Sequence, residues 1–252
     1  MGLEIRALDG KVGTVDELLF DDEFWTVRYL VVNTTGWLAG KKVLLSPLAL
    51  GALDWAENAL NVNLTCEQIE NSPGGETDLP VSRQWEMQHY DYYSLPYYWD
   101  GVGSWGAYGS PLGLLSNTVS ETYTLHQDAI REEREGAESR AHEHADAHLR
   151  SATEVTGYGI ATRDGHLGHV EDILIQEDTW RICYLAVDTR DWWPGKKILL
   201  PPSLIEHISW PDRSVAVCVT RDQVKGAPEW EVGQKVTPIF EDLLQSYYRR
   251  EK

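Results

Sequence analysis

Two short stretches decide the fold of this 252-residue chain: Asp9-Gly-Lys-Val-Gly-Thr-Val15 and Asp164-Gly-His-Leu-Gly-His-Val170. They are separated by an offset of 155 residues, and the same offset aligns residues 9–73 with residues 164–228 without a gap. About a third of the paired positions are identical, and most others exchange one apolar residue for another. Self-similarity at a fixed spacing is typical of repeated structural units. We therefore interpret the chain as a duplication of one unit of about 75 residues, near the smallest size that folds alone.

Each unit is predicted to consist of short β-strands. The runs Trp25–Val32 and Trp180–Val187 are rich in β-branched and aromatic residues, which favours strands that begin at two core tryptophans. Each unit then ends in Thr-x-x-Gln, at Thr65–Gln68 and Thr220–Gln223, a pattern that opens a helix with a capping box. Five or six short strands in one unit predict a small closed barrel, because closure removes exposed sheet edges.

The segments outside the repeats differ in composition. Residues 74–118 are rich in Gly, Pro, Trp and Tyr, whereas residues 119–150 are charged and carry alanines at helical spacing. The predicted organisation is a first barrel, its aromatic tail, a polar helical linker, a second barrel and a C-terminal tail, over residues 1–73, 74–118, 119–150, 151–228 and 229–252.

The repeated motifs resemble the PRC-barrel family, which includes the cytoplasmic barrel of the photosynthetic reaction-centre H subunit. The similarity lies in the Asp-Gly-x-Val/Leu-Gly-x-Val start, the Trp-x-x-x-Tyr-Leu-x-Val strand, the Gly-Lys-Lys-x-Leu-Leu turn and the Thr-x-x-Gln-x-x-x-x-Pro exit. It implies a mainly β fold of two small PRC-like β-barrels in tandem, with short helices and an aromatic-rich tail after each barrel. The tails also pair by residue type, Tyr90-Asp91 and Tyr97-Tyr98 with Phe240-Glu241 and Tyr247-Tyr248.

The family is defined by its fold rather than by one activity, so the resemblance transfers no catalytic residues. The chain lacks the H subunit's membrane helix, and it also lacks the N-terminal domain and basic patch of the family's ribosome maturation factor. What the resemblance implies is a soluble tandem PRC-barrel protein.

Charge and cysteine content exclude several classes of function. The chain carries 40 acidic and 22 basic residues, a net charge of −18, and such a surface repels the phosphates of nucleic acids and anionic membranes. No apolar run reaches the roughly 20 residues of a membrane helix, so membrane insertion is not expected. The three cysteines form no CxxC pair, which favours reduced thiols and a cytoplasmic location.

The aromatic residues provide the main candidate for an interaction site. The chain has 11 Trp and 12 Tyr but only 3 Phe, and Trp and Tyr are the aromatic residues enriched at protein interfaces. Two interpretations of residues 85–105 stay open: the segment wraps its own barrel, or it binds a second chain. The candidate interaction residues are Tyr92, Tyr93, Tyr97, Tyr98, Trp99 and Trp105.

The polar linker provides the candidate metal ligands. His144 and His148 lie at i and i+4, on one face of the expected helix, where two imidazoles suit zinc or nickel. The alternative is a solvated acidic helix that binds no metal. No cofactor is expected elsewhere in the chain.

No set of nucleophile, base and acid is recognisable, and function must be argued from such a site. We therefore predict a non-enzymatic scaffold or adaptor that binds another protein, with stress as one setting. The alternative is a small-ligand or metal-responsive binding protein that uses the linker histidines. Whether the chain forms a homo-oligomer stays open.

Overall fold

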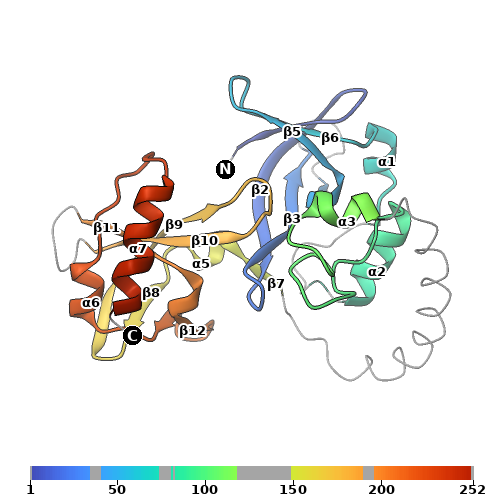
Figure 1. Cartoon of the computed structure of the whole chain (residues 1–252). Helices are drawn as coiled ribbons and strands as arrows, with labels where there is room; N and C mark the ends of the chain where they lie inside the picture. The colour runs from blue at the N-terminus through green and yellow to red at the C-terminus, as the bar shows by residue number, and fades with distance from the viewer. Residues whose placement is uncertain are drawn as a thin grey trace. The chain divides into compact units, whose positions relative to one another are not determined.

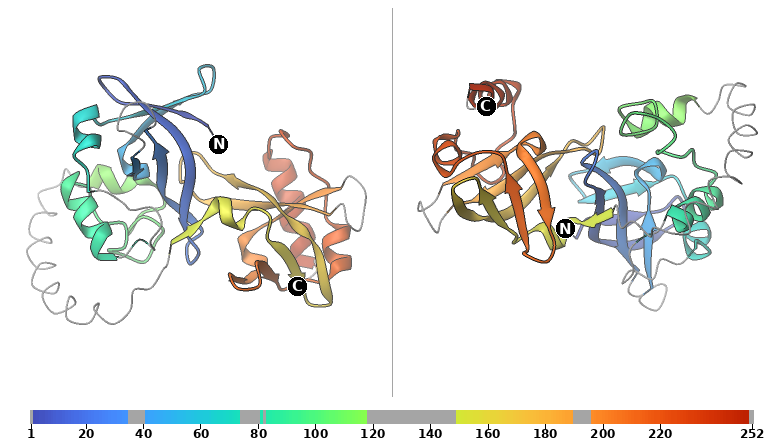
Figure 2. Two further views of the ribbon diagram at one scale, coloured as in Figure 1. Left: turned by 180° about the vertical axis from the view of Figure 1, so that it is seen from behind. Right: turned by 90° about the horizontal axis from the view of Figure 1, so that it is seen from below.

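The computed structural model describes residues 2–34, 41–73, 81, 83–117, 149–189 and 196–250. The chain divides into two compact units. Unit 1 comprises Met1–Ser151 with Glu177–Trp180, and unit 2 comprises Ala152–Gln176 with Arg181–Lys252. Each unit is mainly β, with a few short helices beside its sheet (Figures 1 and 2).

Unit 1 is built on a seven-stranded sheet with the order β4-β3-β2-β1-β6-β5, in which β7 pairs with β2. All its pairs are antiparallel except β1 with β6. Among the described residues of this unit, three helices and the 3₁₀ turn η1 accompany the sheet. The elements are β1 Glu4–Arg6, β2 Lys11–Asp21, β3 Thr26–Asn33, β4 Lys42–Leu45, η1 Pro47–Ala49, β5 Leu50–Asp54, β6 Ala59–Val62, α1 Cys66–Glu70, α2 Arg83–Tyr92, α3 Pro111–Asn117 and β7 Leu149–Ser151. Residues 149–150, assigned to the linker from sequence, thus belong to the sheet of unit 1.

Unit 2 has a six-stranded sheet with the order β11-β10-β9-β8-β13-β12. Here too, every pair is antiparallel except one, β8 with β13. The elements are α5 Ala152–Val155, β8 Gly159–Thr162, β9 Gly165–Ile175, β10 Ile182–Asp188, β11 Lys197–Leu200, η2 Pro202–Leu204, β12 Ile205–Ser209, β13 Ser214–Val217, α6 Arg221–Gly226 and α7 Pro238–Arg250.

Specific contacts recur in the two units at positions 155 residues apart, which we call matched positions. Asp9 Oδ1 accepts a hydrogen bond from the Cys66 N–H at 2.7 Å, and Asp164 Oδ1 accepts one from the Arg221 N–H at 2.8 Å. In both units, the Asp of the Asp-Gly turn therefore joins the first hairpin to the first residue of a helix.

Two matched glycines are required by the same close approach of backbone. A Cβ on Gly13 would lie 2.0 Å from the carbonyl oxygen of Asn33, and a Cβ on Gly168 would lie 1.9 Å from that of Asp188. No side chain fits at either position without moving the neighbouring strand. The second glycine of the repeated motif thus allows two strand backbones to approach closely.

The capping boxes expected from sequence are confirmed. Thr65 and Thr220 are N-caps whose hydroxyl oxygens accept from the backbone N–H of Gln68 and Gln223. Each glutamine side chain in turn accepts from the backbone N–H of its threonine.

The expectation that Trp25 and Trp180 are core strand residues is wrong. Both have positive φ, 52° and 57°, and both side chains are only partly buried. Each occupies the turn of a hairpin, where the left-handed backbone reverses the chain, and the following strand begins after it.

The sheets are open over the described residues. No ladder joins β4 to β5 or β11 to β12, the pairs that would close each sheet into a barrel. Pro47 and Pro202 stand between these edge strands, and proline has no N–H with which to extend a ladder.

Candidate functional site

Helix α2 places a buried carboxylate at the centre of unit 1. Glu86 is fully buried, and its Oε1 accepts hydrogen bonds from the hydroxyls of Tyr29 at 3.1 Å and Tyr98 at 2.7 Å. The guanidinium of Arg83, one turn earlier, lies 3.0 Å from the other carboxylate oxygen. A buried charge is tolerable only when it is paired and hydrogen-bonded in this way. Glu86 therefore joins β3, α2 and the segment after α2.

A buried arginine in strand β3 forms a second joint. The Arg28 guanidinium donates to Asp21 Oδ2 at 2.6 and 3.0 Å and also donates to the Ser104 carbonyl. It lies 3.9 Å from the ring centroid of Tyr98 and 4.9 Å from that of Trp105. Cation–π contacts of this kind are worth more when they are shielded from water. Arg28 thereby holds residues 98–105, the aromatic segment after α2, against the sheet.

The candidate interaction residues are mostly inside unit 1. Trp105, Tyr98 and Tyr97 are 0%, 3% and 6% exposed. Tyr92 is 40% exposed, while Tyr93 and Trp99 lie between these extremes. In this structure a partner would reach Tyr92 and parts of Tyr93 and Trp99, whereas the other three belong to the hydrophobic core.

His89, on the buried face of α2, was not singled out from the sequence. It is 1% exposed, and within the described part of the chain neither ring nitrogen has a hydrogen-bond partner. Its ring stacks on Trp85 at 4.8 Å and meets Tyr29 and Tyr93 edge-on at 5.4 and 4.9 Å. Burial lowers the pKa of His89 from its ordinary value of 6.5 to about 3, because the charged ring would lose its hydration.

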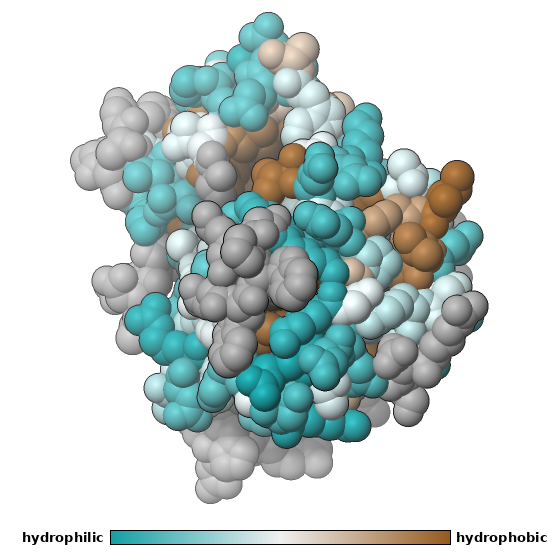
Figure 3. Space-filling view, turned by 90° about the vertical axis from the view of Figure 1, so that its left-hand side faces the viewer, coloured by the Kyte–Doolittle hydropathy of each residue, from teal (hydrophilic) through white to brown (hydrophobic). Residues whose placement is uncertain are grey.

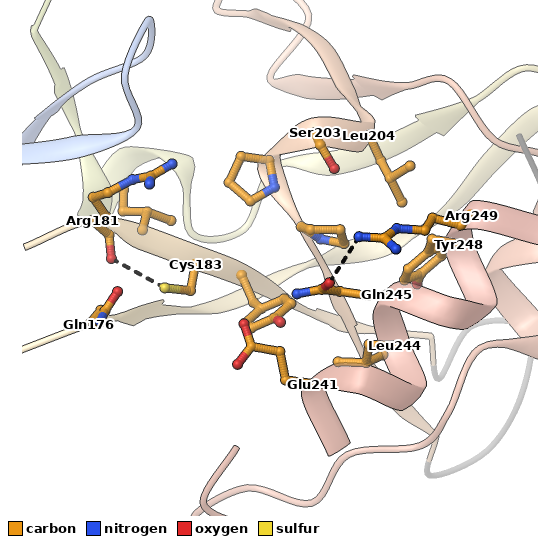
Figure 4. A pocket seen from close by; sticks show the side chains of 14 residues that line it. Gln176, Arg181, Cys183, Ser203, Leu204, Glu241, Leu244, Gln245, Tyr248 and Arg249 are labelled. Atoms are coloured by element: carbon orange, nitrogen blue, oxygen red, sulfur yellow. Dashed lines mark hydrogen bonds between the residues drawn. The ribbon is translucent and has the colours of Figure 1, made fainter. Parts of the chain in front are cut away.

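Unit 2 contains a groove of about 470 Å³ between strand β10, the turn η2 and helix α7. Tyr184, Leu244 and Tyr248 line it and are buried, whereas Glu241 and Gln245 are exposed and project from α7 toward the strand (Figure 4). Burial raises the pKa of Tyr184 to about 12, and the Glu241 carboxylate adds to the increase. The groove therefore has an apolar base and a polar rim, the usual composition of a ligand site.

Exposed apolar side chains also occur outside the groove. The face drawn in Figure 3 is mostly hydrophilic, with separate brown areas. Exposed apolar residues of unit 2 include Ile239 and Leu243 on α7, at 82% and 53% exposure. They are four residues apart, so they lie on one face of the helix.

The linker histidines His144 and His148 lie outside the described residues, so the proposed metal site stays a prediction. Over the residues that the structure does describe, no three His, Cys, Asp or Glu side chains are grouped to hold an ion. The helices in those ranges are also too short or too polar to cross a bilayer.

The helices after the two sheets match with a register that differs from the one expected. The Tyr92 hydroxyl donates to the Gln68 carbonyl at 2.9 Å, and the Tyr247 hydroxyl donates to the Gln223 carbonyl at 2.7 Å. Both tyrosines and both acceptors are 155 residues apart, so α2 and α7 follow the offset of the sheets. Pairing Tyr90-Asp91 with Phe240-Glu241 by residue type was therefore wrong, because aromatic identity shifted the alignment away from this contact.

No family model matches the chain, and no curated protein matches it. The class of protein is thus defined by its own structure, as a mainly β chain of two units with the same strand order.

Proposed function

We propose that this chain is a non-enzymatic scaffold made of two copies of one PRC-like unit, and that it binds another protein. The proposal of two copies is supported by the shared strand order and by the contacts that recur at matched positions. Asp9 with Cys66 and Asp164 with Arg221 are one such pair, and Tyr92 and Tyr247 provide another.

The buried charges of unit 1 support a structural rather than a chemical role. Glu86 is bonded to two tyrosines and an arginine, and Arg28 is bonded to an aspartate and a backbone carbonyl. These groups hold the aromatic segment in place. The three cysteines are free thiols, which supports a reducing compartment such as the cytoplasm.

The observation that carries the binding proposal is the exposed apolar pair of α7. Ile239 and Leu243 expose apolar area to water on one face of α7. An exposed apolar patch is a typical feature of a contact surface. A partner that covered both would remove their apolar area from water.

The test is affinity capture from lysate of the source organism, quantified by mass spectrometry. The bait is the full chain, and the comparison bait carries Ile239→Ser with Leu243→Ser. The proposal predicts a protein that is enriched by the first bait and depleted by the second. Equal recovery with both baits, or recovery of the bait alone, would contradict it.

A further inference from the structure

In unit 1, the side chain of Tyr98 fills the space between strand β3 and helix α2. Its hydroxyl donates to Glu86 at 2.7 Å, and its ring lies 3.9 Å from the Arg28 guanidinium. The Tyr90 ring lies 5.8 Å away on a third side. Tyr98 and the neighbouring Trp105 thus close this space with residues of the same chain, their rings 6.1 Å apart.

Three residues that surround Tyr98 have matched positions in unit 2 that line the groove. Arg28, Glu86 and Tyr90 correspond to Cys183, Glu241 and Gln245, which lie around the groove between β10 and α7. Tyr29, whose hydroxyl also bonds to Glu86, corresponds to Tyr184 at the base of the groove. The groove of unit 2 is therefore the space that Tyr98 occupies in unit 1.

Exposure differs between the two units as this correspondence requires. Arg28, Glu86 and Tyr90 are each at most 1% exposed, because the segment after α2 covers them. Cys183 is half-buried, and Glu241 and Gln245 are exposed. Over the described residues of unit 2, no aromatic segment covers this space.

We propose that the groove of unit 2 binds an aromatic segment of a partner protein, with a tyrosine ring between Cys183 and Gln245 and its hydroxyl donating to Glu241. This inference rests on the proposed function and names the chemistry of the partner. The occupant is a segment resembling Ser94–Tyr108 of this chain, because that segment fills the matched space of unit 1.

The chemistry of the groove suits an aromatic ring. Burial raises the pKa of the Cys183 thiol, so the side chain is neutral and presents a polarisable sulfur to a ring. Leu244 and Tyr248 supply the apolar base, at 1% and 4% exposure. Glu241 supplies one acceptor, which fixes the orientation of a tyrosine and favours it over phenylalanine.

The experiment uses the full chain and a fluorescein-labelled synthetic peptide with the sequence of Ser94–Tyr108, measured by fluorescence anisotropy. Gln245→Trp places an indole in the groove from an exposed position, so the helix tolerates it. Ser246→Trp is the matched control, since it adds the same side chain to an exposed position of α7 that does not line the groove. Circular dichroism verifies that both variants are folded.

The proposal predicts that the peptide binds the wild-type chain and the Ser246→Trp variant equally. Gln245→Trp should weaken binding at least tenfold, or by about 1.4 kcal/mol, the order expected when a central aromatic anchor is lost. The unmodified peptide should bind most tightly. The Tyr98→Phe peptide should bind more weakly, and the Tyr98→Ala peptide should bind most weakly.

Three results would contradict the proposal that the groove binds an aromatic segment of a partner protein. The first is no binding to the wild-type chain, and the second is binding that Gln245→Trp leaves unchanged. The third is a dimer of the wild-type chain, detected by sedimentation, that Gln245→Trp dissociates, because the occupant would then be a second copy. If the capture experiment succeeds while peptide binding fails, the scaffold proposal stands and the groove alone is refuted.

Discussion

Acidification should destabilise unit 1 through His89, and the size of the effect follows from the pKa of its buried ring. The ordinary pKa of 6.5 applies to the unfolded chain, and burial lowers it to about 3 in the folded chain. Between these values the unfolded chain binds a proton that the folded chain does not, so stability is lost as the pH falls below 6.5. The loss is about 2 kcal/mol at pH 5 and approaches about 5 kcal/mol below pH 3.

Substitution by leucine isolates this contribution. His89→Leu places in unit 1 the residue that unit 2 has at the matched position, Leu244, which is 1% exposed. The variant removes two ring nitrogens that have no partner among the described residues, and it also loses the stacking on Trp85. These effects oppose each other, so stability at pH 7 should stay within about 1 kcal/mol of the wild type.

The assay is urea unfolding of the full chain at pH 7 and pH 5, followed by tryptophan fluorescence. The difference in unfolding free energy between the two pH values should be about 2 kcal/mol smaller in His89→Leu than in the wild type. His207→Leu is the control, because this exposed histidine of β12 should leave the difference unchanged. An equal pH dependence in His89→Leu and the wild type would refute the reasoning.

Three further predictions concern stability, each measured by urea unfolding. Arg28→Met should cost about 3–5 kcal/mol because it leaves Asp21 buried without its cation, and adding Asp21→Asn should recover part of the loss; additive costs would show that the two residues are not coupled. Thr65→Ala and Thr220→Ala should each cost about 1 kcal/mol, since each removes the same cap, and no loss in either would contradict the capping role. Gly168→Ala should cost at least about 2 kcal/mol because its Cβ would meet the Asp188 carbonyl, whereas Gly157→Ala, with positive φ but open space, should cost about 1 kcal/mol; the reverse order would contradict the close approach.

The parts of the fold that depend on local pattern were predictable from sequence. The β-rich runs and the capping boxes of Thr65 and Thr220 are set by residues close together in the chain. The turn positions of Trp25 and Trp180 were not predictable in this way. A tryptophan before a β-branched run is typical of a strand, so the sequence pattern places it in one. Its positive φ is required only by the reversal of the chain, which the local pattern does not indicate.

The interior of unit 1 depends on contacts between distant residues, so the sequence revealed less of it. Tyr29 meets Glu86 and Arg28 meets Ser104 across long stretches of chain. A signal was present, since Arg28 interrupts the otherwise apolar run of β3 and a buried strand tolerates arginine only with a partner. His89 carried no such signal, because an isolated histidine on a helix is compatible with either burial or exposure.

The most direct test of the account is a crystal structure of the full chain bound to the Ser94–Tyr108 peptide. The account predicts the peptide between β10 and α7, with its Tyr98 hydroxyl at the Glu241 carboxylate and its ring beside Cys183. A peptide bound on another face, or a groove that stays empty in crystals grown with saturating peptide, would contradict it.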